Sequence, residues 1–147
     1  IYTKSELEAR AEIMYETYAK VIKIEANTMT HMAGKHYIPA AIHYTTRLGQ
    51  SIAAVSGAGL DAELTVQKSL LVKCSKLLSE ADAALETLKG LLTEVDALED
   101  IKEMAWAYHD KVVPAMTALR SPVDELELLV DKDIWPVPTY GDLMFEV

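Results

Sequence analysis

Apolar residues recur at alternating steps of three and four through the second half of the chain. One such stripe begins at Leu64 and continues to Val95, over more than four heptads, and a second continues from Leu98 to Leu129. This spacing places the apolar residues on one face of an α-helix and leaves the other faces polar. The two stripes therefore predict two long amphipathic helices that pair along their apolar faces.

The alternation fails between the two stripes, where two steps of three adjoin. A turn at this point predicts separate helices over 61–93 and 97–130, with Asp96 as the N-cap of the second helix. One long helix with a local change of heptad register is the alternative. In either case Leu78 and Leu85 are expected in the core.

The first third of the chain also has helical spacing and predicts helices over 4–34 and 37–56. Gly34 ends or weakens the first of these, and Pro39 either opens the second or kinks a continuous helix. The sequence leaves open whether the two segments form separate helices or one rod. The apolar stripe of the first helix consists of Leu7, Ala11, Met14, Tyr18, Val21, Met29 and Met32. Glu25 interrupts this stripe and is expected to pair with Lys23, with Lys35 or with a cation of a partner.

Prolines interrupt the last predicted helix. Pro114 removes one backbone hydrogen bond and predicts a kink, and Ser121 before Pro122 predicts a second kink where a short final helix begins. No segment alternates as a half-buried β-strand does. Residues 1–130 are therefore predicted to form an all-α, antiparallel bundle of about four long helices.

Residues 131–147 differ in character from the rest of the chain. The segment Trp135-Pro136-Val137-Pro138 cannot be helical, because proline lacks a backbone N–H and restricts the residue before it. The segment also carries large apolar side chains, which disordered tails rarely have. We expect an extended, non-helical arm that docks onto this bundle or a neighbouring domain through Trp135, Tyr140 and Phe145.

The composition narrows the function classes. Fourteen Lys and Arg against 23 Asp and Glu give a net charge of −9, so the chain lacks the basic surface that nucleic acid binding requires. The least charged stretch, 36–60, is too rich in polar residues to span a membrane. One cysteine, Cys74, excludes an internal disulfide. These features are typical of a soluble cytoplasmic domain.

The residues most often used in catalysis form no recognisable motif. None of the four histidines follows a glutamate by three residues and no two are four residues apart, so the helical di-iron and zinc motifs are missing. Gly57-x-Gly59 is similar to a dinucleotide-binding loop but lies between predicted helices. Cys74 lies on an apolar stripe, where burial makes it a poor nucleophile. We predict no catalytic, cofactor-binding or metal-ligating residue in the chain.

Several segments carry the motifs of a known family. The chain opens with Ile1-Tyr2-Thr3-Lys4-Ser5-Glu6-Leu7 and ends with W-P-x-P-T-Y-G-D-L-x-F over 135–145. These segments resemble the C-terminal region of type III glutamine synthetase, the large bacterial form, over essentially the whole chain. The resemblance implies a parent enzyme that condenses glutamate with ammonia through a γ-glutamyl phosphate, uses ATP and magnesium or manganese, and assembles as a dodecamer. The ligands of these groups belong to the family's catalytic domain, which would precede Ile1.

The resemblance favours a non-catalytic structural or assembly domain that contacts the catalytic domain of the same chain and neighbouring subunits. A free-standing helical bundle that binds partner proteins is the alternative, and it predicts an exposed apolar groove between helices. A small-ligand sensor is a third hypothesis, which requires a polar pocket among Tyr18, Tyr44 and Trp106.

Overall fold

The computed structural model describes residues 2–59, 61–138 and 140–145, with the side chain of Tyr140 outside this description. All regular secondary structure in these residues is helical, so the predicted all-α class is confirmed. The elements, in chain order, are α1 (Lys4–Met32), the π-helical turn η1 (Ala33–Tyr37), α2 (Ile38–Gly57), α3 (Thr65–Asp96), α4 (Ile101–Ala107), the π-helical turn η2 (Tyr108–Val112), α5 (Val113–Glu127) and α6 (Tyr140–Phe145).

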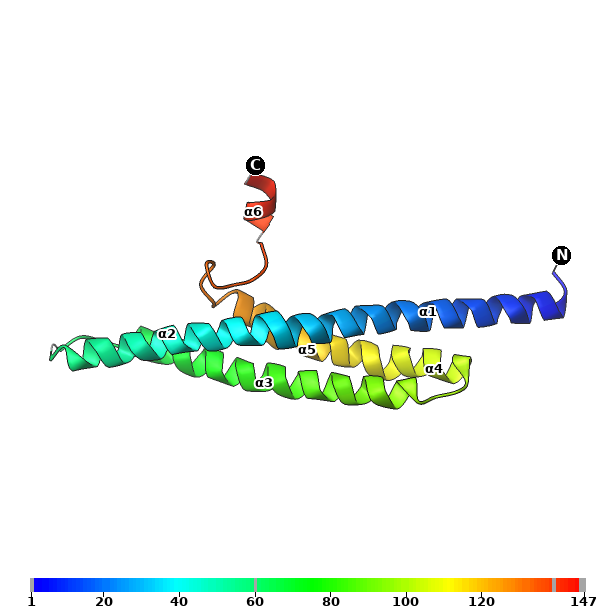
Figure 1. Cartoon of the computed structure of the whole chain (residues 1–147), viewed down its shortest axis with the longest axis horizontal. Coiled ribbons are helices and arrows are strands. Elements are labelled where there is room, and N and C mark those ends of the chain that lie inside the picture. Colours follow the sequence, from blue (N-terminus) through cyan, green and yellow to red (C-terminus); the bar gives the residue numbers. More distant parts are fainter. Residues whose placement is uncertain (1, 60, 139, 146–147) are drawn as a thin grey trace.

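These elements form three rods that lie side by side (Figure 1). The first rod is α1, η1 and α2 in sequence, the second is α3, and the third is α4, η2 and α5. The chain reverses direction after α2 and again after α3, so α3 is antiparallel to both other rods and packs mainly against α2 and α5. The described helices do not include one able to cross a membrane, by length and hydropathy.

A π-helical turn precedes a proline in two of the rods. Pro39 and Pro114 are each the second residue of the helix that follows such a turn. Proline cannot donate to the carbonyl four residues earlier and its ring crowds that carbonyl, whereas a π turn widens the backbone at that point. The first third of the chain is therefore one continuous rod, and Gly34 and Pro39 do not divide it into two separate helices.

The core lies along α3, whose buried residues follow the predicted stripe. Leu85 and Leu88 are almost fully buried there, and Leu78 is half-buried against the same cluster. Tyr108 and Val112 of η2 and Leu119 of α5 meet this face from the third rod. The two predicted stripes therefore do pack against each other, as their periodicity indicates.

The turn between α3 and α4 differs from the prediction. The N-cap of α4 is Asp100, whose carboxylate accepts a hydrogen bond from the backbone N–H of Glu103 at 2.7 Å, so the prediction of Asp96 as the cap was wrong. Asp96 is instead the last residue of α3 and accepts a hydrogen bond from the Tyr108 hydroxyl at 3.0 Å. It also forms an ion pair with Lys23 of α1 at 2.8 Å, so one carboxylate links all three rods.

The buried face of α1 also differs from the predicted stripe. Ala19 and Ala26 are buried, whereas Leu7 and Met14 are 54% and 73% exposed. The first turns of α1 extend past the turn between α3 and α4 (Figure 1), so a side chain such as Leu7 has no helix to pack against, whereas Met14 lies beside α4 at a shallow, open groove. Where α1 does meet the bundle, small alanines let the helices approach closely. The face with the alanines is therefore buried, and the face with the larger side chains stays exposed.

The C-terminal arm is not wholly extended. Residues 140–145 form the six-residue helix α6, which corrects the prediction of a non-helical arm. Pro136 and Pro138 lie before this segment and so do not interrupt it. Asp142, in the first turn of α6, interacts favourably with the helix dipole. Pro122 lies inside α5, which continues through it, so Ser121 does not begin a new helix.

Candidate docking surfaces

The arm is held at its base by a compact turn. The carbonyl oxygen of Asp131 accepts hydrogen bonds from the backbone N–H groups of Ile134 and Trp135 at 2.9 and 3.0 Å. The Asp131 carboxylate accepts from the N–H of Asp133 at 3.0 Å and pairs with Arg47 of α2 at 3.3 Å. The turn therefore reverses the chain and directs Trp135 back onto the first rod.

Trp135 stacks on Tyr37, the last residue of η1. The two ring centroids are 5.1 Å apart with an interplanar angle of 10°, and Trp135 is only 8% exposed. Burial raises the pKa of Tyr37 above its ordinary value, and the negative charges of Glu127 and Asp124 raise it further. The sequence predicts Trp135 as a docking residue because its side chain is large and apolar. Nothing in the sequence around Tyr37 identifies it as the residue on which Trp135 stacks.

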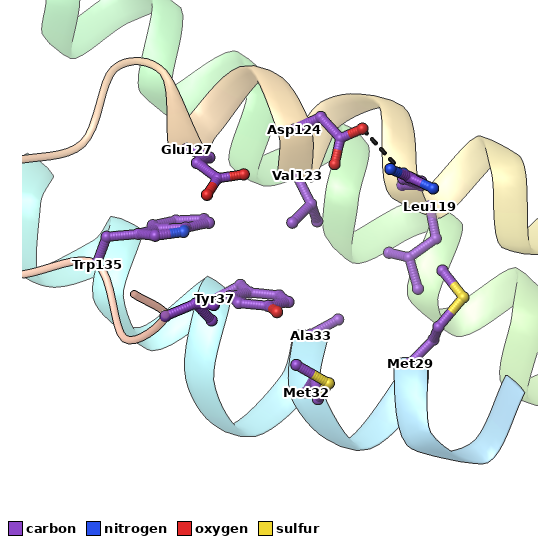
Figure 2. Close-up of a pocket in the computed structure, with 11 residues that line it drawn as sticks. Met29, Met32, Ala33, Tyr37, Leu119, Val123, Asp124, Glu127 and Trp135 are labelled. Atoms are coloured by element: carbon purple, nitrogen blue, oxygen red, sulfur yellow. Dashed lines mark hydrogen bonds and ion pairs between the residues drawn. The ribbon is translucent and has the colours of Figure 1, made fainter. Parts of the chain in front are cut away.

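A half-open cavity of about 320 Å³ lies beside this stacked pair (Figure 2). Its walls come from α1, η1, α5 and the arm, which are brought together only in the folded bundle. The lining residues are Met29, Met32, Ala33, Tyr37, Leu119, Arg120, Val123, Asp124, Glu127, Trp135 and Val137.

The end of the arm stands away from the bundle (Figure 1). In α6, Leu143, Met144 and Phe145 are 68%, 69% and 80% exposed, and an ion pair joins Asp142 to Lys132 near the base of the arm. Of the three predicted docking residues, Trp135 packs onto this bundle and Phe145 does not, and the Tyr140 side chain lies outside the described residues. α6 therefore presents a short apolar surface to whatever lies next to the bundle.

A second apolar surface lies between α1 and α4. Met14, Tyr15 and Tyr18 of α1 face Ala105, Trp106 and His109 across a shallow groove of about 260 Å³. Trp106 is 52% exposed, and its ring contacts His109 edge-on with centroids 5.8 Å apart. Tyr44 does not line this groove and packs at the core on α2, so the three-residue pocket of the sensor hypothesis does not form.

The surroundings of the remaining titratable side chains do not indicate a catalytic role for them. Cys74 is fully buried, and burial raises its pKa, so the unreactive thiol form is favoured. Glu25 has no ion pair among the described residues, and Lys23, one of its expected partners, pairs with Asp96. Burial and the hydrogen bond to Asp96 strongly raise the pKa of Tyr108. The raised pKa values keep the Cys74 thiol and the Tyr108 hydroxyl protonated, and Tyr108 joins the third rod to α3 through its hydrogen bond to Asp96.

Comparison with known proteins identifies the relatives of this chain. Residues 1–56 match a family model described as the glutamine synthetase C-terminal domain. The chain is also 30% identical over 149 residues to a glutamine synthetase of Bacteroides fragilis, an alignment that covers 99% of this chain and 20% of that protein. The chain is therefore similar to the C-terminal domain of glutamine synthetases. The resemblance that the sequence motifs indicated is thereby confirmed.

Two further relatives of this domain show the same similarity. A glutamine synthetase of Butyrivibrio fibrisolvens is 32% identical over 151 residues, covering 100% of this chain and 21% of that protein. A type-3 glutamine synthetase of Dictyostelium discoideum is 28% identical over 154 residues, covering 99% and 20%. The domain therefore spans about a fifth of the length of the curated relatives it matches.

The domain's own residues do not fit the divalent metal that the resemblance implies for the parent enzyme. Within residues 2–59, 61–138 and 140–145, no three His, Cys, Asp or Glu side chains come close enough to hold a metal ion. No step that involves a metal is therefore assigned to these residues.

Proposed function

We propose that this chain is a non-catalytic structural domain that helps a glutamine synthetase to assemble. In this proposal the full-length protein acts in the cytoplasm and condenses glutamate with ammonia, using ATP and magnesium or manganese bound outside this chain. The partners of the domain are the catalytic domain of the same polypeptide and neighbouring subunits of a dodecamer. The relatives that carry the name glutamine synthetase are about five times as long as this chain, which supports a role as one part of a larger enzyme.

The observation that carries the proposal is the exposed apolar surface of α6. Trp135 anchors the base of the arm, while Leu143 and Phe145 remain solvent-exposed at its end. Burying a side chain of this size stabilises an assembly by about 1.5–3 kcal/mol. An anchored segment with adjacent exposed apolar residues is typical of a contact between protein surfaces.

Removing the arm from the full-length protein tests this proposal. We expect truncation after Lys132 to reduce the size or the thermal stability of the assembly, measured by light scattering. A double variant, Leu143→Ser with Phe145→Ser, should have the same effect while leaving the Trp135 anchor in place. Leu128→Ser is the matched control, because Leu128 is 86% exposed on the bundle and not on α6. Unchanged assembly in both arm variants would overturn the proposal.

A free-standing module that binds partner helices is the second candidate, and the groove between α1 and α4 favours it. Met14, Tyr18 and Trp106 offer the exposed apolar contacts that such a module needs. The mass of the native polypeptide separates the two candidates. An immunoblot of a cell extract should detect a protein of about 16.3 kDa if the module is free-standing, and one about five times larger if it is part of a synthetase.

A further inference from the structure

The cavity beside Trp135 combines an apolar interior with an acidic mouth. Met29, Met32 and Leu119 provide apolar surface from two different rods. Its volume of about 320 Å³ lies near the lower end of the range for small-molecule sites. A ligand that fits this space therefore has an apolar body of roughly the size of one aromatic ring with a short chain.

The charges around the mouth favour a cation. Asp124 pairs with Arg120 at 3.0 Å on the same helix, so these two charges largely cancel. Glu127 forms no ion pair with any described residue, so its charge is left uncompensated at the mouth. The raised pKa of Tyr37, which depends in part on Glu127 and Asp124, reflects the same negative field.

The aromatic wall adds a second attraction for a positive group. In the view of Figure 2, the Glu127 carboxylate and the Tyr37 ring lie on opposite sides of the Trp135 ring. Because Tyr37 stacks on one face of Trp135, the other face is the one turned toward Glu127. A cation near that face would interact with both the carboxylate and the electron-rich indole ring.

We propose that this cavity binds a small organic cation, with its ammonium group between Glu127 and Trp135 and its apolar body on Met29, Met32 and Leu119. Trp135 and Val137 belong to the arm, whereas the other lining residues belong to the bundle. A bound cation therefore bridges the two parts and stabilises the docked arm, by an amount that grows with the logarithm of its concentration above the dissociation constant.

Three probes of nearly equal shape test the charge requirement. Binding of 2-phenylethylamine, 2-phenylethanol and 3-phenylpropanoate to the full-length protein is measured by isothermal titration calorimetry at millimolar concentrations. We expect the amine to bind about fivefold more tightly than the alcohol, since one partly exposed ion pair and one cation–π contact contribute to its binding alone. The carboxylate should bind more weakly than the alcohol.

Two glutamate variants assign the preference to this cavity. Glu127→Gln should remove the advantage of the amine over the alcohol, whereas Glu125→Gln should preserve it. Glu125 lies on the same helix but faces Lys73 of α3, at 3.9 Å, and does not line the cavity. Equal affinity for amine and alcohol, an unchanged preference in Glu127→Gln, or no binding of any probe would each overturn the proposal.

Discussion

The packing of the bundle around Leu85 makes a direct prediction about stability. Leu85 is 3% exposed in the middle of α3, and one of its methyl carbons lies 3.6 Å from the position that a Cβ atom on Gly34 would occupy. Leu85→Ala removes three buried carbon atoms at the point where α3 crosses η1. Their transfer free energy is about 2.4 kcal/mol, and the cavity they leave raises the expected loss to about 3–4 kcal/mol.

This loss is measured by urea unfolding of the chain, followed by circular dichroism at 222 nm. A loss of that size also lowers the midpoint of thermal unfolding by about 6–16 °C for a chain of this length. Leu128→Ala is the control, because Leu128 is 86% exposed and its truncation should change stability by less than about 0.5 kcal/mol. The packing of α3 against η1 would be refuted if both variants lost the same stability, or if Leu85→Ala lost less than about 1 kcal/mol.

Three further variants test other parts of the bundle. Gly34→Ala should raise stability by about 0.5–1 kcal/mol in the same urea assay, because Gly34 is inside a continuous rod and the added methyl group makes only an ordinary contact with Leu85. Tyr108→Phe should lower stability by about 1 kcal/mol at pH 7 through loss of the hydrogen bond to Asp96. The pKa of Tyr108 is raised in the folded chain, so an unfolded tyrosine loses its proton first; stability should fall as pH rises above the ordinary value of 10.0, and less steeply in the Phe variant. Trp135→Ala should release the arm, seen as faster proteolytic cleavage of residues 131–138 with the bundle intact.

The sequence predicted the second and third rods better than the first, for a physical reason. The stripes on α3 and α5 contain leucine and valine, and η2 adds Tyr108, so large side chains mark the buried face without ambiguity. On α1 the large side chains and the buried side chains lie on different faces. A pattern search follows residues such as Met14, whereas packing selected Ala19 and Ala26, because close approach of two helices needs small residues.

The candidate docking site was predictable only in part. Trp135 could be singled out because a large aromatic residue between prolines has little use in a disordered segment. Tyr37 and Glu127 could not, because they lie on two other elements and their approach to Trp135 depends on the tertiary fold. Sequence periodicity reports which face of an element is buried and does not report which distant side chains meet there.

The π turn before Pro39 determines both how α2 packs against α3 and where Tyr37 lies in the cavity. Along the first rod the most deeply buried positions are Ala19, Ala26, Ala33, Ala41 and Leu48, separated by seven, seven, eight and seven residues. The single step of eight spans η1, where a π turn accommodates one additional residue. A regular α-helix would rotate every later side chain by about 100° relative to this arrangement. The residue inserted in η1 therefore keeps the small-residue face of α2 toward α3, and it also turns Tyr37 toward the cavity, where Trp135 of the arm stacks on it.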